Sequence, residues 1–286
     1  MSKPPSKPPT KSFSKPFAKP FGKPDFRKQK RLDKPVPASL RGDQPKALGP
    51  TPDPANDLIF GIHAVAAALS NDKRKVVRLW ATENGFNRLK EEGITSTAAP
   101  EIVHPRILDH MLTGQDAVHQ GVVLEAQALK QPRLDQVARD GLIVLLDQVT
   151  DPHNVGAILR SCAAFGVAAL VTTARHAPNE SGVFFKAASG AYEHVPVTRV
   201  TNLSAAMEEL RGYGFRLVGL DSEAEVSLDA VEKSRPLALV LGAEGKGLRE
   251  KTRTTCDVVA KLDMPGAIKS LNVSIATAIS LYALTR

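Results

Sequence analysis

Residues 142–160 read LIVLLDQVTDPHNVGAILR, and this stretch decides the fold class. Its first five residues form an apolar run, typical of a strand that is buried on both faces of a parallel sheet. Asp147 ends the run, a turn containing Pro152 follows, and residues 154–165 are typical of a helix. A buried strand, a polar loop and a helix in this order predict the start of an α/β domain.

The same alternation continues to the last residue of the sequence. Further strands are expected at 168–171, 195–200, 216–220, 237–241 and 258–262, and further helices at 203–211 and 271–284. The sequence therefore predicts an α/β domain over residues 141–286 with a mainly parallel sheet.

A second, smaller α/β domain is expected upstream, over residues 57–130. Helices are predicted at 62–69, 87–92 and 106–112, and strands at 76–81, 102–103 and 121–126. The polar stretch 131–140, which contains Pro132, is expected to link the two domains.

The N-terminal residues differ sharply in composition. Residues 1–50 hold 13 Lys+Arg against 3 Asp, a net charge of +10, whereas the whole chain carries +8, so the other 236 residues carry −2. Eleven of the 21 prolines also lie in this segment. We expect residues 1–56 to be a disordered basic tail whose lysines can neutralise RNA phosphates. A solubilising tail without a specific partner is the alternative.

Several classes of protein are excluded by composition. No apolar run reaches the roughly 18–20 residues of a membrane-spanning helix, and the first residues lack the apolar segment of a secretory signal. Two cysteines, Cys162 and Cys256, are too few for a disulfide framework or a four-cysteine zinc site. We therefore expect a cytoplasmic protein without a metal cofactor.

Three polar loops follow predicted strands, at the sheet edge where α/β proteins bind ligands. The first loop lies within residues 142–160. The second loop reads LGAEGKGLRE at 241–250, and the third reads LDMPGAIKSLNVS at 262–274. The second is not a P-loop, because Gly247 is followed by Leu248 rather than by Lys and Ser or Thr. Its glycine order also differs from a dinucleotide fingerprint.

Each polar residue of these loops also has a purely structural interpretation. Asn154 could cap a helix, Arg160 could be a solvated helix residue, and Glu244 could be a surface turn acid. Ser270 could cap the last helix, with Asn272 in its first turn. The occurrence of three such loops in one domain favours a functional site.

The three segments resemble, in order and spacing, the motifs of the SpoU/TrmH branch of the SPOUT methyltransferases. Residues 154–156 with Arg160 are similar to the first motif, 242–245 to the second, and Pro265 with 270–274 to the third. Upstream, the segments 60–65 and 117–121 resemble the ribosomal-protein-like RNA-binding domain of one subgroup. That subgroup includes the enzyme that methylates a guanosine ribose in 23S rRNA.

The resemblance implies a fold and a cofactor. The fold is a parallel-sheet domain whose C-terminal chain forms a trefoil knot, and the assembly is a homodimer. The cofactor is S-adenosylmethionine (AdoMet), bound next to Gly242, Leu262 and Leu271. The implied partner is RNA.

The resemblance also implies a set of catalytic residues. They are Asn154, Arg160, Glu244, Ser270 and Asn272. A ribose 2′-hydroxyl becomes a good nucleophile only when its proton is drawn away, but a guanidinium with a pKa above about 12 is a poor base. We therefore expect Arg160 to orient the ribose and a phosphate, since a planar cation suits phosphate oxygens.

The sequence thus predicts AdoMet-dependent 2′-O-ribose methylation of RNA, on a guanosine of 23S rRNA. Two alternatives stay open at this point. One is a tRNA ribose 2′-O-methyltransferase, and the other is a non-catalytic RNA-binding or ribosome-assembly protein. The complete set of motif residues argues against the second.

Overall fold

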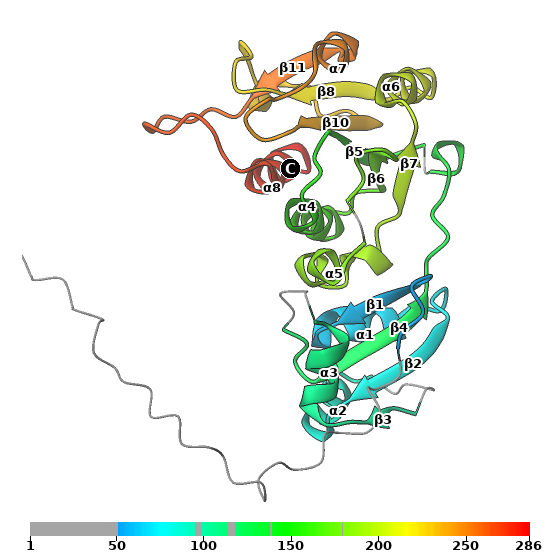
Figure 1. Ribbon diagram of the computed structural model, residues 1–286. Helices are drawn as coiled ribbons and strands as arrows, with labels where there is room; N and C mark the ends of the chain where they lie inside the picture. Colours follow the sequence, from blue (N-terminus) through cyan, green and yellow to red (C-terminus); the bar gives the residue numbers. More distant parts are fainter. Residues whose placement is uncertain (1–50, 95–98, 114–117, 138, 179) are drawn as a thin grey trace, which may run out of the picture. The chain divides into compact units, whose positions relative to one another are not determined.

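The computed structural model describes residues 51–94, 99–113, 118–137, 139–178 and 180–286 (Figure 1). The basic segment 1–50 lies outside the described residues, as does Ala117 of the upstream motif. Among the residues described, no helix combines the length and apolar character that crossing a membrane requires.

The N-terminal part is built on a four-stranded sheet of order β1-β4-β2-β3, in which β4 pairs antiparallel with both of its neighbours. Its strands are β1 (Asn56–Phe60), β2 (Val76–Ala81), β3 (Glu101–Ile102) and β4 (Val122–Gln127), and its helices are α1 (Ile62–Ser70), α2 (Glu83–Glu91) and α3 (Pro105–Met111). The expected elements are present, and β1 is an additional strand that the sequence pattern did not predict.

The C-terminal part is built on a seven-stranded sheet of order β7-β6-β5-β10-β8-β11-β9, in which every pairing is parallel. Its strands are β5 (Leu142–Asp147), β6 (Ala169–Thr173), β7 (Val197–Val200), β8 (Arg216–Leu220), β9 (Val226–Ser227), β10 (Leu237–Gly242) and β11 (Val258–Lys261). Its helices are α4 (Pro152–Ala164), α5 (Gly182–Ala188), α6 (Leu203–Gly212), α7 (Glu250–Thr255) and α8 (Val273–Leu284). The predicted parallel α/β domain is confirmed, whereas the trefoil knot stays a prediction.

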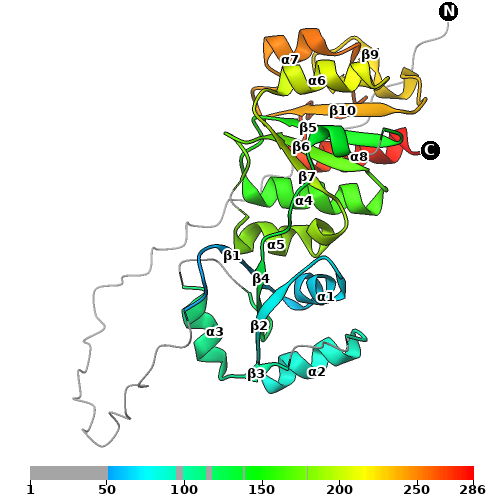
Figure 2. The ribbon, with the colours of Figure 1, turned by 90° about the vertical axis from the view of Figure 1, so that its right-hand side faces the viewer.

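Strand β5 is buried on both faces, as its unbroken apolar run predicts. Ile143 and Leu145 belong to the core cluster that includes Met207 of α6, and Val144 belongs to the cluster that includes Ile158 of α4. Helices α6 and α7 accordingly cover one face of the sheet, and α4 and α8 cover the other (Figures 1 and 2). Each fully buried aliphatic side chain contributes about 1.5–3 kcal/mol to this packing.

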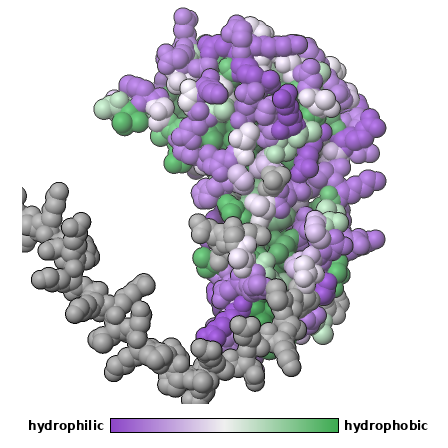
Figure 3. All heavy atoms as spheres, in the orientation of Figure 1, coloured by the Kyte–Doolittle hydropathy of each residue, from purple (hydrophilic) through white to green (hydrophobic). Residues whose placement is uncertain are grey.

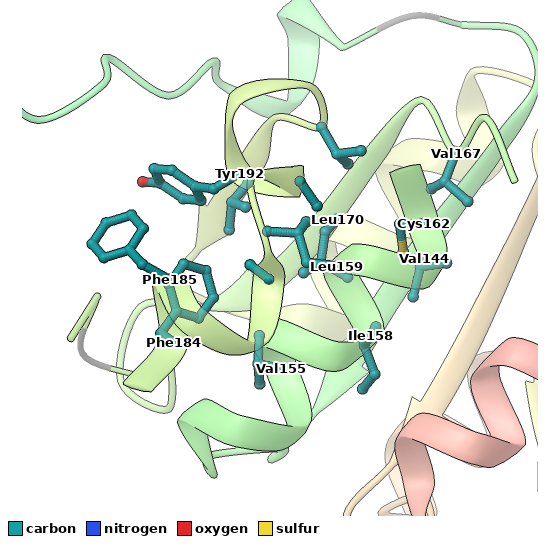
Figure 4. Packing of buried hydrophobic residues seen from close by; sticks show 14 of the residues in the cluster. Val144, Val155, Ile158, Leu159, Cys162, Val167, Leu170, Phe184, Phe185 and Tyr192 are labelled. Carbon is teal, nitrogen blue, oxygen red and sulfur yellow. The ribbon is translucent and has the colours of Figure 1, made fainter. Parts of the chain in front are cut away.

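Helix α5 packs directly on α4, and a glycine permits the close approach. A Cβ on Gly156 would lie 2.7 Å from the Ala187 Cβ and 2.7 Å from the Phe184 carbonyl oxygen. Around this contact the aromatic rings of Phe184, Phe185 and Tyr192 pack edge to face beside the apolar side of α4 (Figure 4). The position of α5 along α4 is therefore fixed by packing.

The strand order reverses at β5. Strands β6 and β7 lie on one side of β5, and β10 lies on the other. Ligands of open α/β sheets bind beyond the carboxyl ends of the strands at such a point. The loops after β5, β10, β8 and β11 all begin at this edge.

Candidate active site

The glycine-rich loop after β10 folds back tightly on itself. A Cβ on Gly242 would lie 2.1 Å from the Gly247 carbonyl carbon and 2.4 Å from the Leu248 nitrogen, so only glycine fits there. The Gly247 N–H donates to the Ala243 carbonyl at 2.9 Å, and Gly245 and Gly247 have φ of +77° and +63°. The loop is thus a closed turn that exposes backbone groups at the end of β10.

Asp147 anchors the far end of this loop. Its carboxylate is fully buried and accepts from the Arg249 backbone N–H at 3.0 Å and from the Arg249 Nε at 2.7 Å. Hydrogen bonds between charged partners are shorter and stronger than neutral ones. The first and second loops are therefore joined, and sequence reasoning missed this role although Asp147 ends a buried strand.

Asn272 joins all three motifs through one side chain. Its Nδ2 donates to the Asn154 Oδ1 at 3.0 Å and to the Glu244 Oε2 at 3.3 Å. Its Oδ1 accepts from the Ser274 N–H at 2.9 Å and from the Ser274 Oγ at 2.6 Å. Because the oxygen holds the start of α8, the amide nitrogen is directed at the two partners from the other loops.

The structural interpretations of Asn154 and Ser270 as helix caps are wrong. Helix α4 begins at Pro152, and Asp151 caps it by accepting from the His153 N–H at 3.0 Å. Helix α8 begins at Val273 and is capped by Asn272. The side chain of Asn154 is thereby available for the contact with Asn272, and Ser270 lies in the loop before α8.

A cavity of about 130 Å³ opens beside this cluster. The three residues expected at the cofactor, Gly242, Leu262 and Leu271, all line it, and so do Glu244 and Ser270. The remaining lining is mostly apolar and includes three polar side chains: Leu220, Asp221, Ser222, Leu241, Ala243, Gly247, Met264, Lys269, Val273 and Ala276.

Two charged residues of this cavity were missed by sequence reasoning. Asp221 directly follows β8, and its carboxylate pairs with Arg253. Lys269 donates from Nζ to the Met264 carbonyl at 2.7 Å and so closes the loop before α8. The position of Asp221 after a strand was a usable signal, whereas nothing in the local sequence singles out Lys269.

Arg160 lies apart from the Asn272 cluster. It is exposed on α4 and lines a neighbouring cavity of about 790 Å³ together with His153, Lys186 and Ser274. Ser274 lines this cavity and also donates to Asn272, so it lies between the cluster and the cavity. The structure thus brings Asn154, Glu244 and Asn272 into direct contact, places Ser270 at the first cavity and Arg160 at the second.

Neither cysteine has the properties of a nucleophile. Burial raises the pKa of the Cys162 thiol far above its ordinary value. Burial also raises the pKa of Cys256 to about 12, with Asp257 adding to the effect. Since the thiolate is the reactive form, the chemistry of this site belongs to the oxygen and nitrogen groups described above.

Comparison with known proteins agrees with this fold. Residues 141–282 match the profile of the SpoU rRNA Methylase family, and residues 58–132 match the profile described as RNA 2′-O ribose methyltransferase substrate binding. The chain belongs to the SpoU rRNA Methylase family.

Individual proteins that are similar to this chain have names that describe a narrower activity. The 23S rRNA (guanosine-2′-O-)-methyltransferase RlmB of Photobacterium profundum is 37% identical, over 81% of this chain and 98% of that protein. RlmB of Pseudomonas putida is also 37% identical, over 80% of this chain and 95% of that protein. The SpoU methyltransferase AviRb of Streptomyces viridochromogenes, solved in complex with the cofactor AdoMet, superimposes with a TM-score of 0.68 at 25% identity, covering 81% of this chain and 89% of that one.

Proposed function

We propose that this protein transfers the methyl group of AdoMet to the ribose 2′-oxygen of a guanosine in 23S rRNA. The observation that carries the proposal is the Asn272 side chain, which joins Asn154 and Glu244 next to a cavity closed by the glycine loop. The RlmB relatives, which this chain matches over nearly their whole length, support the substrate.

The residues that line the first cavity suit the chemical groups of AdoMet. Leu262 and Leu271 offer apolar surface to an adenine ring, and the backbone around Gly242 can approach a ligand without a side chain in the way. Asp221 and Lys269 offer charges opposite to those of the amino and carboxylate groups of a methionine moiety. When bound, AdoMet supplies a methyl group on a positively charged sulfur.

The residues that line the two cavities have different roles in methyl transfer. Methyl transfer would form the bond from O2′ to the methyl carbon, release S-adenosylhomocysteine as the sulfur–carbon bond breaks, and pass the hydroxyl proton to solvent. Arg160 holds a phosphate and the ribose so that O2′ faces the first cavity. Asn154, whose amide is fixed by Asn272, orients the ribose, while Glu244 and Ser270 hold the loop beside it.

We assign a function to each domain from these roles. Residues 57–130 bind RNA, 131–140 link the domains, and 141–286 carry methyl transfer. The basic segment 1–50 adds RNA affinity that does not depend on sequence. An rRNA substrate supports a cytoplasmic location for the enzyme.

We further propose that two copies assemble through α8. Ile275, Ile279 and Tyr282 recur at helical spacing and are 52%, 43% and 46% exposed. Figure 3 shows apolar surface in the region of this helix. A single helical stripe is suited to pack on its own copy across a two-fold axis. Light scattering should therefore give a dimer for the wild type and a monomer for Ile279→Arg. A wild-type monomer would contradict the proposal.

The activity is tested with labelled AdoMet and unmodified transcripts of 23S rRNA and of tRNA. The wild type should label 23S rRNA at a ribose, and Arg160→Ala should lose most of this activity. Arg216→Ala is the control, because Arg216 begins β8 at the opposite edge of the sheet and pairs with Glu232 at 2.8 Å. Labelling of tRNA alone would overturn the rRNA target, and labelling of neither RNA would contradict the catalytic function.

A further inference from the structure

Lys186 lies between the catalytic helix and the RNA-binding domain. It belongs to α5, which packs against α4 on one side and against β1 on the other (Figures 1 and 2). Its side chain is exposed and lines the same cavity as Arg160. It also lines a smaller cavity of about 170 Å³, whose other walls include Gly61, His63 and Gln120 of the RNA-binding domain. Lys186 is therefore shared by two adjacent cavities.

The smaller cavity has a rim of constrained backbone. Gln120 and Ser189 both line it, with φ of +52° and +49°, and they are two of the three non-glycine residues with positive φ among the described residues. Such conformations cost energy and occur preferentially where a ligand is bound. The Gln120 Oε1 accepts from the Ile62 N–H at 3.0 Å, which fixes this wall at the start of α1.

The ammonium group of Lys186 is available to a ligand. Within the described residues it forms no ion pair, and the acidic side chains nearest to it in sequence have partners of their own. Glu180 pairs with Arg199 at 2.6 Å, and Glu193 pairs with the buried Arg74 at 2.6 Å. A cation without an ion-pair partner among the described residues, located between Arg160 and the smaller cavity, is suited to a phosphate.

We propose that Lys186 binds a backbone phosphate of the substrate RNA between the target nucleotide, held at Arg160, and a flanking nucleotide, held in the cavity of Gly61, Gln120 and Ser189. The inference rests on the proposed function, because it assumes that RNA reaches Arg160. It adds a specific route by which the RNA strand continues from the methyl-transfer site onto the RNA-binding domain.

The test compares Lys186→Ala and Lys186→Arg with the wild type. Lys251→Ala is the matched control, because Lys251 is also exposed but lies on α7, on the opposite face of the sheet. The probe is an unmodified 23S rRNA transcript, whose Kd is measured over a range of salt concentrations. AdoMet affinity, KM for the RNA and kcat are measured on the same preparations.

Lys186→Ala should weaken RNA binding by about 5–10-fold at low salt and reduce the slope of log Kd against log salt by about 0.7–0.9, the value of one lost phosphate contact. KM should rise more than kcat falls, AdoMet affinity should be unchanged, and Lys186→Arg should restore most of the binding. A Kd and a salt slope equal to those of Lys251→Ala would overturn the inference. A wild type that binds RNA through Lys186 but transfers no methyl group would instead overturn the proposed function.

Discussion

Substitutions of Asn272 should affect stability and activity to different extents, because the oxygen and the nitrogen of its side chain have different partners. The oxygen caps α8, and the nitrogen holds Asn154 and Glu244. Asn272→Ala removes both functions. Asn272→Asp keeps an oxygen at the helix start but removes both donors and places a second carboxylate next to Glu244.

The magnitudes follow from these contacts. Loss of an Asn cap costs about 0.5–2 kcal/mol, and each hydrogen bond contributes about 1 kcal/mol. The exposed bond to Glu244 contributes little, so the cap and the part-buried bond to Asn154 are counted at about 1 kcal/mol each. We therefore expect Asn272→Ala to lose about 2 kcal/mol, which lowers Tm by about 4–8 °C in a domain of this size. Asn272→Asp should lose only about 1 kcal/mol, since Asp is as good a cap as Asn and its charge favours the helix start. Both variants should lose about 100-fold in methyl transfer, equal to about 2.7 kcal/mol.

The assay is thermal unfolding without AdoMet, followed by single-turnover methyl transfer to 23S rRNA. Asn202→Ala is the control, because Asn202 caps α6 on the other face of the sheet by accepting from the Ala205 N–H at 3.3 Å. It should lose comparable stability and keep its activity. The reasoning is refuted if Asn272→Asp transfers methyl groups at the wild-type rate, or if Asn272→Ala unfolds at the wild-type temperature.

Three further predictions concern the glycine loop, the cysteines and the basic segment. Gly242→Ala should lower AdoMet affinity at least about 10-fold in calorimetry, because its Cβ would overlap the Gly247 backbone. The control Gly212→Ala, which has open space around its Cβ, should bind AdoMet with wild-type affinity. The native protein should resist alkylation by iodoacetamide at pH 8, since a pKa of about 12 keeps Cys256 neutral and burial raises that of Cys162 further; rapid modification of either thiol would contradict this. Deletion of residues 1–50 should weaken RNA binding at low salt and flatten its salt dependence, and an unchanged slope would rule out phosphate contacts by this segment.

The strands were the most predictable part of the fold. The apolar run of β5 and the regular alternation after it place every strand of the seven-stranded sheet except β9 within a few residues of its observed bounds. Helices α5 and α7 were not predicted, because they are short, at Gly182–Ala188 and Glu250–Thr255, and carry little periodicity of their own. Their positions are set by packing, as the contact of Gly156 with Ala187 shows for α5.

The site was predictable in its residue types and less so in its contacts. The motifs identified Asn154, Glu244 and Asn272, but the Asn272–Asn154 hydrogen bond joins residues 118 positions apart. Arg74 illustrates the same limit: its side chain is fully buried between Asp57 and Glu193, and Glu193 lies 119 residues away. Local sequence does not show which distant partner a polar side chain will find.

The most direct test of the proposed function maps ribose methylation in total RNA from cells with and without the gene for this protein. We expect the loss of one 2′-O-methylguanosine in 23S rRNA when the gene is absent, and its return when the wild-type gene, but not Arg160→Ala, is restored. An unchanged methylation pattern at every rRNA position would contradict the account.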